Sequence, residues 1–241
     1  MISTDSHISI DFWSTLVNGA TGGDKRKRIR YEALQSLARK KHLHLTDEDI
    51  ERAQGRVSKE FDRVWMGEQR TYTTYELVVM LLRHLDMRIS DEELDQLIET
   101  FEHSFLEGAP ELAPYVEVAI PKLAERYSLS IISDTMFTPG HTIREYLRRQ
   151  GLFQYFHTFI FSDEAGYSKP DPRVFKAVLE ATHTKADQSY HIGDLQQTDI
   201  QGAQSVGMNA ILYTGITKDQ QANTTAEHIC ASWEEIVQLM L

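Results

Sequence analysis

Carboxylates, hydroxyls and one lysine recur in this sequence, most of them just after short apolar segments. A carboxylate in such a position can act as a nucleophile or hold a divalent cation, and a lysine beside it can neutralise an anionic substrate. These residue types therefore suit the displacement of a leaving group from a small substrate. The positions are Asp11 after residues 8–10, Ser133 and Asp134 after residues 129–132, Lys169 in the turn formed by residues 168–171, and Asp194 after residues 190–193, with Asp199 shortly beyond.

The apolar segments have the pattern of buried strands separated by helices. We expect strands at about 8–12, 129–133, 156–161, 189–193 and 209–213, with a last pairing segment near 228–230. Helices are expected at about 113–127, interrupted near Pro121, then at 141–149, 172–182 and 198–206, and from Ser232 onward. This alternation predicts βαβ units and a parallel sheet. Right-handed crossovers then place the strand ends, and the polar residues that follow them, at one edge.

A helical insertion is expected early in the chain. Gly22 and Gly23 lie in a glycine-rich turn that looks like a hinge. From Lys25 to Glu107 the apolar residues recur at helical spacing without a convincing strand, and about four helices are predicted. The expected fold is a doubly wound, Rossmann-like α/β core of residues 1–16 and 108–241, with an inserted all-helical cap domain of residues 17–107.

Composition narrows the classes of function. The hydrophobic fraction of 41% and the charged fraction of 25% are those of an ordinary soluble globular protein. A formal net charge of −11 argues against nucleic acid or an anionic membrane as a partner. No apolar run approaches the length of a membrane span, and Met1–Asp5 lacks the pattern of a signal peptide. The single cysteine, Cys230, suits a reducing compartment, so we expect a cytoplasmic protein of undetermined oligomeric state.

Four motifs in this order resemble those of the haloacid dehalogenase superfamily, and the resemblance spans the whole chain. The helical segment after the first motif corresponds to the type of cap that lies between motifs one and two. The matching segments are Asp11-Phe12-Trp13-Ser14-Thr15, Ile131-Ile132-Ser133-Asp134, Ser168-Lys169-Pro170-Asp171, and Gly193-Asp194 followed by Thr198-Asp199.

The resemblance implies a Mg²⁺-dependent hydrolase of the phosphatase type, acting on a small phosphorylated metabolite through an aspartyl-phosphate intermediate. It assigns Asp11 as the nucleophile and Ser133 and Lys169 as catalytic residues, with Ser133 donating a hydrogen bond to the phosphate and Lys169 as the cation beside it. Ser133, Asp134 and Lys169 are implied to bind the substrate. It assigns the metal to Asp11, Asp194 and the main-chain carbonyl of Trp13. Thr15 and Asp199 are implied to contact these residues and hold them in position without touching the substrate or the metal.

The resemblance breaks at Trp13. Phosphatases of this family carry a second Asp two residues after the nucleophile, which protonates the leaving oxygen and later activates the attacking water. An indole N–H only donates and does not titrate, so losing that role would cost about 10²–10⁴ in rate. The metal ligand at this position is a carbonyl, so the Mg²⁺ site need not be lost.

Three interpretations stay open. The first is a phosphatase-type hydrolase whose substrate needs little protonation of the leaving group, or that takes an acid from the cap. The second is a 2-haloacid dehalogenase, since that branch has an aromatic residue where this chain has Trp13, although it lacks Mg²⁺ and replaces Gly193-Asp194 and Asp199 by other residues. The third is a non-catalytic binding module that keeps the pocket.

Two further groups of residues in the cap have ordinary interpretations. The basic residues 25–28 with Arg30 are interpreted as a solvated helix face, with an anion clamp as the alternative. The aromatic residues Phe61, Trp65 and Tyr72 are interpreted as part of the cap core rather than as a surface for stacking a substrate.

Overall fold

The computed structural model describes residues 6–217 and 223–241. No helix within these ranges combines the length and the apolar character needed to cross a lipid bilayer. The strands are β1 His7–Ile10, β2 Val17–Asn18, β3 Glu111–Leu112, β4 Ser128–Ser133, β5 Phe156–Phe161, β6 Ser189–Gly193, β7 Asn209–Tyr213 and β8 His228–Cys230. The helices are α1 Gly23–Lys40, α2 Asp47–Glu68, α3 Thr74–His84, α4 Asp91–Glu107, α5 Val116–Ala124, α6 Gly140–Arg149, α7 Ser162–Ala165, α8 Pro172–Thr182, α9 Gln201–Ser205 and α10 Trp233–Met240.

Six parallel strands form the main sheet in the order β5-β4-β1-β6-β7-β8. Strand β1 lies inside this sheet, with Ile10 opposite Ile131 on one side and Ile192 on the other. All four residues of β1 are buried, as expected for a strand covered on both faces.

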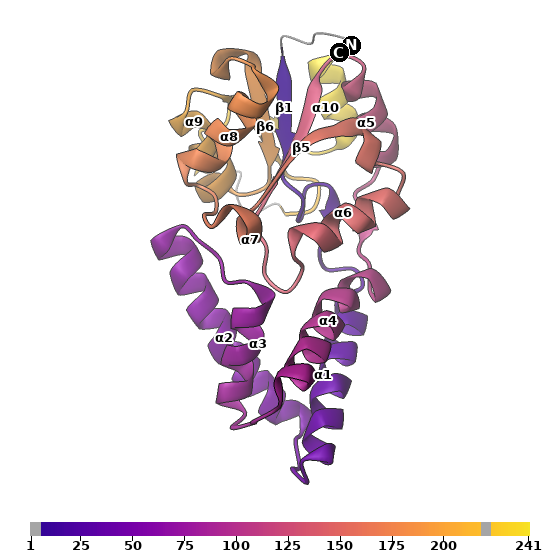
Figure 1. Ribbon diagram of the computed structural model, residues 1–241. Helices are drawn as coiled ribbons and strands as arrows, with labels where there is room; N and C mark the ends of the chain where they lie inside the picture. Colours follow the sequence, from indigo (N-terminus) through magenta and orange to yellow (C-terminus); the bar gives the residue numbers. More distant parts are fainter. Residues whose placement is uncertain (1–5, 218–222) are drawn as a thin grey trace.

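Helices cover both faces of the sheet. Helices α5, α6 and α10 pack on one face through a continuous apolar cluster, and α8 and α9 pack on the other (Figure 1). The predicted doubly wound α/β fold is therefore confirmed.

The four helices α1–α4, called the cap helices below, lie together beyond the carboxyl ends of the strands (Figure 1). Their apolar faces form a separate cluster, which Phe137 of the β4–α6 loop joins through an edge contact with Phe101. Thr46, Thr73 and Ser90 cap α2, α3 and α4, each in a reciprocal capping box. The predicted helical insertion is confirmed, but its first two residues, Val17 and Asn18, form strand β2 and pair with β3. The assignment of residues 17–107 to a domain of its own stays a prediction.

Two local predictions were wrong. Helix α5 is not interrupted near Pro121, but continues through it from Val116 to Ala124. Proline removes one backbone donor, but Ala119, Ile120 and Leu123 of the same helix are fully buried, and this packing outweighs the lost bond. The single helix expected over 198–206 is instead a π-helical turn at Gln196–Ile200 followed by the short α9.

Arg26 joins the two segments through which the chain enters and leaves the cap helices. Its guanidinium donates to the carbonyls of Gly19 at 2.8 Å, Thr21 at 3.0 Å and Gly108 at 2.7 Å. The same segments pair as β2 and β3. Gly22 adopts φ 69°, and a Cβ there would lie 2.2 Å from the Gly108 carbonyl oxygen. The predicted turn is therefore a close backbone crossing that requires glycine; its motion as a hinge stays a prediction.

Replacing Arg26 by Lys should destabilise the protein by about 1–3 kcal/mol, since one ammonium group cannot serve three carbonyls, of which that of Gly108 is buried and those of Gly19 and Thr21 are partly buried, and unpaired buried acceptors are costly. Urea denaturation measures this loss. Arg28→Lys is the matched control, because Arg28 is exposed and makes one ion pair, with Asp47 at 3.4 Å. Equal losses in the two variants would contradict the role given to Arg26.

His7 should make the protein sensitive to acid. Its Nε2 pairs with Ser130 Oγ at 2.9 Å, and burial, assisted by His191, lowers the pKa of His7 to about 3. The unfolded chain binds a proton near pH 6.5, so the stability from neutral His7 is complete above that pH and is lost as pH falls toward 3.

Between pH 7.5 and 5.0 the wild type should lose about 2 kcal/mol more stability than His7→Gln. Chemical denaturation at both pH values tests this, since both proteins keep every other titrating group. Parallel losses would show that His7 is not the cause.

Candidate active site

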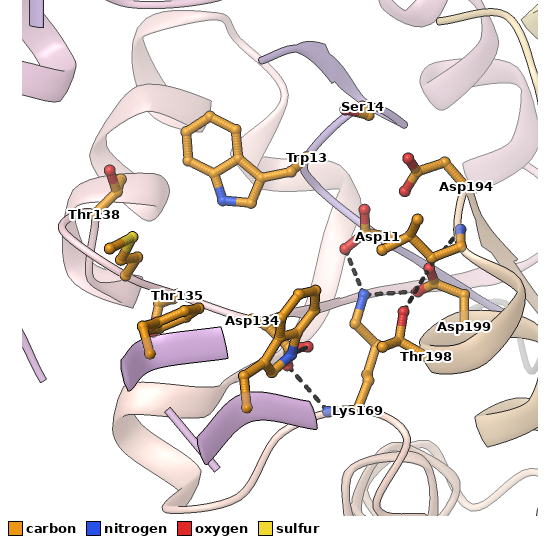
Figure 2. Close-up of a pocket in the computed structure, with 14 residues that line it drawn as sticks. Asp11, Trp13, Ser14, Asp134, Thr135, Thr138, Lys169, Asp194, Thr198 and Asp199 are labelled. Carbon is orange, nitrogen blue, oxygen red and sulfur yellow. Dashed lines mark hydrogen bonds and ion pairs between the residues drawn. The ribbon is translucent and has the colours of Figure 1, made fainter. Parts of the chain in front are cut away.

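Asp11, Lys169 and Asp199 meet at the carboxyl edge of the sheet, although they are distant in sequence. Asp11 follows β1, Lys169 lies in the loop between α7 and α8, and Asp199 lies in the π-helical turn after β6. Lys169 Nζ donates to Asp11 Oδ1 at 2.5 Å and to Asp199 Oδ1 at 2.7 Å (Figure 2). The sequence-based expectation that these residues converge is met by this geometry.

Burial strengthens the electrostatic interactions among Asp11, Lys169 and Asp199. Lys169 is 3% exposed, and although burial alone would lower its pKa, the Asp11 and Asp199 carboxylates raise the pKa of Lys169 above its ordinary value. Burial raises the pKa of Asp11 well above its usual range, against the opposing effect of Lys169, and Asp199 adds to the increase. The two carboxylates therefore favour the charged form of Lys169, whereas the charge of Lys169 does not offset the effect of burial on Asp11.

Asp199 anchors Lys169 from behind. Its Oδ1 also accepts from His191 Nε2 at 3.0 Å, and its Oδ2 accepts from the Leu195 N–H at 3.0 Å. Burial would raise the pKa of Asp199, but Lys169 and His191 hold it below the ordinary value. A Cβ at Gly193 would lie 2.3 Å from Asp199 Cγ, so the glycine before Asp194 makes room for this anchor.

Asp194 supplies a second carboxylate to the same cavity as Asp11. Burial and the neighbouring Asp199 raise the pKa of Asp194 to about 7. Two such carboxylates favour a bound cation, so this pair fits Mg²⁺. Among the described residues no group of three or more His, Cys, Asp or Glu side chains is placed to hold a metal. Mg²⁺ at this pair would therefore depend on further oxygen ligands, such as the Trp13 carbonyl and water.

Asp134 connects the site to the cap helices. Its Oδ1 accepts from the Lys169 N–H at 3.0 Å, and its Oδ2 accepts from Trp65 Nε1 of α2 at 2.8 Å. Burial raises the pKa of Asp134 to about 6. Two more hydrogen bonds join core and cap nearby, from the Ser168 N–H to the Gln69 carbonyl and from Thr71 Oγ1 to Ser162 Oγ.

Ser133 and Thr15 are less engaged than the resemblance implies. Ser133 is buried, its Oγ donates to the Asp134 carbonyl at 3.4 Å, and it does not line the cavity. Thr15 is buried, and its Oγ1 has no hydrogen-bond partner among the described residues. The roles assigned to both residues stay predictions.

A cavity of about 230 Å³ opens between these residues and the cap helices. Trp13 lies on the opposite side of this space from Lys169, with Asp11 between them (Figure 2). Phe61 and Trp65 line it from α2, so their interpretation as cap core alone was incomplete. The basic residues 25–28 and Arg30 do not line it. Lining residues that sequence reasoning did not assign to the site are Ser14, Phe61, Trp65, Thr135, Met136, Thr138, Leu195 and Thr198.

Solved structures share this fold. The 2-haloacid dehalogenase from Pseudomonas syringae pv. Tomato aligns over 98% of this chain and 97% of its own, with 24% identity and a TM-score of 0.75. A HAD-hydrolase from Bacillus subtilis bound to magnesium aligns over 98% of each chain, with 20% identity and a TM-score of 0.67. At these identities the likeness extends to the fold alone.

Sequence comparison establishes the family. A glyceraldehyde 3-phosphate phosphatase from Methanothermobacter thermautotrophicus is 36% identical over 88 residues, which is 36% of this chain and 37% of that protein. The chain spans no more than 56% of the length of three curated haloacid dehalogenase-like hydrolase domain-containing proteins from Bos taurus, Mus musculus and Homo sapiens that it matches. The model of the haloacid dehalogenase-like hydrolase family matches residues 27–213. This match covers most of the sheet and the cap helices, and the chain therefore belongs to the haloacid dehalogenase-like hydrolase family.

Proposed function

We propose that this hydrolase is a Mg²⁺-dependent phosphatase that acts on a small phosphorylated metabolite through an aspartyl phosphate at Asp11. The observation that carries this proposal is the position of Lys169 Nζ between Asp11 and Asp199, beside a cavity that Asp194 also lines. The sequence similarity to a glyceraldehyde 3-phosphate phosphatase and the structural similarity to a HAD-hydrolase bound to magnesium support the proposal.

In the first step an Asp11 oxygen attacks phosphorus, and the bond from phosphorus to the leaving oxygen breaks. Because the indole of Trp13 does not titrate, the leaving oxygen takes its proton from water in the cavity. Lys169 orients the Asp11 carboxylate and neutralises charge on the phosphoryl oxygens as they pass through the transition state. When bound at Asp11 and Asp194, Mg²⁺ supplies further neutralisation of these oxygens.

The second step, hydrolysis of the aspartyl phosphate, should be the slow step in this protein. A water must attack the aspartyl phosphate, releasing inorganic phosphate and the Asp11 carboxylate. Trp13 lines the cavity where the family's phosphatases carry an acid-base Asp, and its indole cannot accept a proton. The covalent intermediate should therefore accumulate, and turnover should be slow.

A 2-haloacid dehalogenase is the second candidate, because Trp13 places an aromatic ring in the cavity close to Asp11. A halide leaves without a proton, so this reaction does not need the missing acid. The carboxylate of Asp194 argues against it, since an Mg²⁺-free reaction on an anionic acid gains nothing from a second negative charge. Halide release without Mg²⁺ would replace the phosphatase by this candidate.

Replacing Asp194 by Asn should weaken Mg²⁺ binding at least tenfold, because it removes one of the two carboxylates that face the cavity. Isothermal titration calorimetry measures the affinity. Asp171→Asn is the matched control, since Asp171 caps α8 and does not line the cavity. Unchanged Mg²⁺ affinity in Asp194→Asn would exclude this metal assignment.

Incubation with an activated phosphate ester and Mg²⁺ should produce one phosphoryl adduct on Asp11, detected by mass spectrometry and absent in Asp11→Asn. The adduct should decay faster in Trp13→Asp than in Trp13→Asn. Both variants lose the indole, but only the aspartate can act as a base. Neither an adduct nor turnover across phosphate esters, acyl phosphates and haloacids would instead favour a non-catalytic module.

A further inference from the structure

The positive charge around the cavity is already engaged. Lys169 is the one cation among the described residues that line it, and its Nζ contacts both Asp11 and Asp199. Arg26 lies 5.9 Å from the Trp13 ring centroid, but its guanidinium donates to three carbonyls and it does not line the cavity. A second anionic group on a substrate would therefore find no free cation among these side chains.

Asp134 adds a carboxylate to the cavity wall at the point where the core meets Trp65 of the cap helices. The N–H of Lys169 and the indole N–H of Trp65, which bind its two oxygens, are both neutral donors that orient the carboxylate. The Lys169 ammonium contacts Asp11 and Asp199, and its charge only partly opposes the effect of burial on the pKa of Asp134. Burial raises the pKa of Asp134 only to about 6, which leaves this group ionised at pH 8.

The remaining walls favour a cation rather than an anion. Trp13, Phe61 and Trp65 present aromatic rings to the cavity, and the faces of such rings attract ammonium groups. An in-line displacement at phosphorus directs the leaving oxygen away from Asp11. The alcohol therefore extends into the space bounded by these rings and Asp134.

We propose that the cavity selects phosphate monoesters of small amino alcohols, whose ammonium group lies against Asp134 and the aromatic walls, and that it rejects esters with a carboxylate on the alcohol. This inference rests on the proposed phosphatase function. The cavity volume of about 230 Å³ limits the alcohol to a few heavy atoms, since pockets for drug-sized ligands are about 300–1,000 Å³.

Three esters of nearly equal size test this selection: 2-aminoethyl phosphate, 2-hydroxyethyl phosphate and carboxymethyl phosphate. They place a positive, neutral or negative group at the same position. At pH 8, low ionic strength and saturating Mg²⁺, kcat/KM for the aminoethyl ester should exceed that for the carboxymethyl ester at least tenfold. The hydroxyethyl ester separates attraction of the cation from repulsion of the anion. Any smaller ratio between the charged esters overturns the inference.

Asp134→Asn should reduce this ratio at least threefold, whereas Asp163→Asn should leave it unchanged. Asp163 is also a carboxylate close to the cavity. Its Oδ1 accepts a hydrogen bond from the hydroxyl of Thr135, which lines the cavity, but Asp163 itself does not line the cavity. Comparing ratios between variants cancels the different intrinsic reactivities of the esters. An unchanged ratio in Asp134→Asn also overturns the inference, and the wild-type ratio decides alone if that variant does not fold.

Failure of the proposed function gives a different result. Hydrolysis of p-nitrophenyl phosphate without discrimination among the three esters would overturn the selection and leave the phosphatase intact. If neither p-nitrophenyl phosphate nor any of the three esters gives turnover or a phosphoryl adduct on Asp11, the phosphatase itself is wrong. In that case the affinities of the wild type for the three esters, measured by calorimetry with Mg²⁺, must still be highest for the aminoethyl ester and lowest for the carboxymethyl ester. Any other order shows that the selection is wrong as well.

Discussion

The burial of Lys169 is the constraint on which the rest of the site depends. An ammonium group removed from water is costly unless carboxylates surround it, and here two of them lie within hydrogen-bond distance. Each of those carboxylates requires its own support. Asp199 obtains it from His191 and the Leu195 N–H, and the close approach of Asp199 in turn requires Gly193. Asp11 has Lys169 as its one ion-pair partner among the described residues. Of the two carboxylates that contact Lys169, the one that the proposal makes the nucleophile is therefore the less neutralised.

The sheet and the meeting of Asp11, Asp194 and Asp199 at one edge are predictable from the sequence, because they follow from strand periodicity and from the handedness of βα crossovers. Lys169 is predictable only through the resemblance of its motif, since it lies in a loop rather than at a strand end. Phe61 and Trp65 show the limit of such reasoning. Their spacing on α2 indicates a buried face, but the same pattern suits a helix that packs only on other helices. Their position on the cavity depends on how the cap helices meet the core, which involves long-range contacts such as Trp65 with Asp134.

Trp13 explains why family membership and activity must be considered separately. The metal site that the resemblance implies uses only the backbone carbonyl at this position, whereas the side chain cannot perform the proton transfers that the family's phosphatases need. Its indole packs in T-shaped contacts with Phe12 and Phe105, so it is integrated into the core beneath the cap helices. A fold can thus keep its charge cluster while the group that controls turnover changes.

The central position of β1 has a consequence for how the chain acquires its structure during synthesis. β1 is the earliest of the described strands to leave the ribosome, yet it pairs with strands at residues 128–133 and 189–193. At about 5–20 residues per second, its second neighbour becomes available roughly 10–40 s after β1 itself. The cap helices are made in between, and their contacts are local enough to form first. Until residues 128–133 have been made the apolar β1 segment has neither neighbour, which makes it a natural target for chaperones on nascent chains.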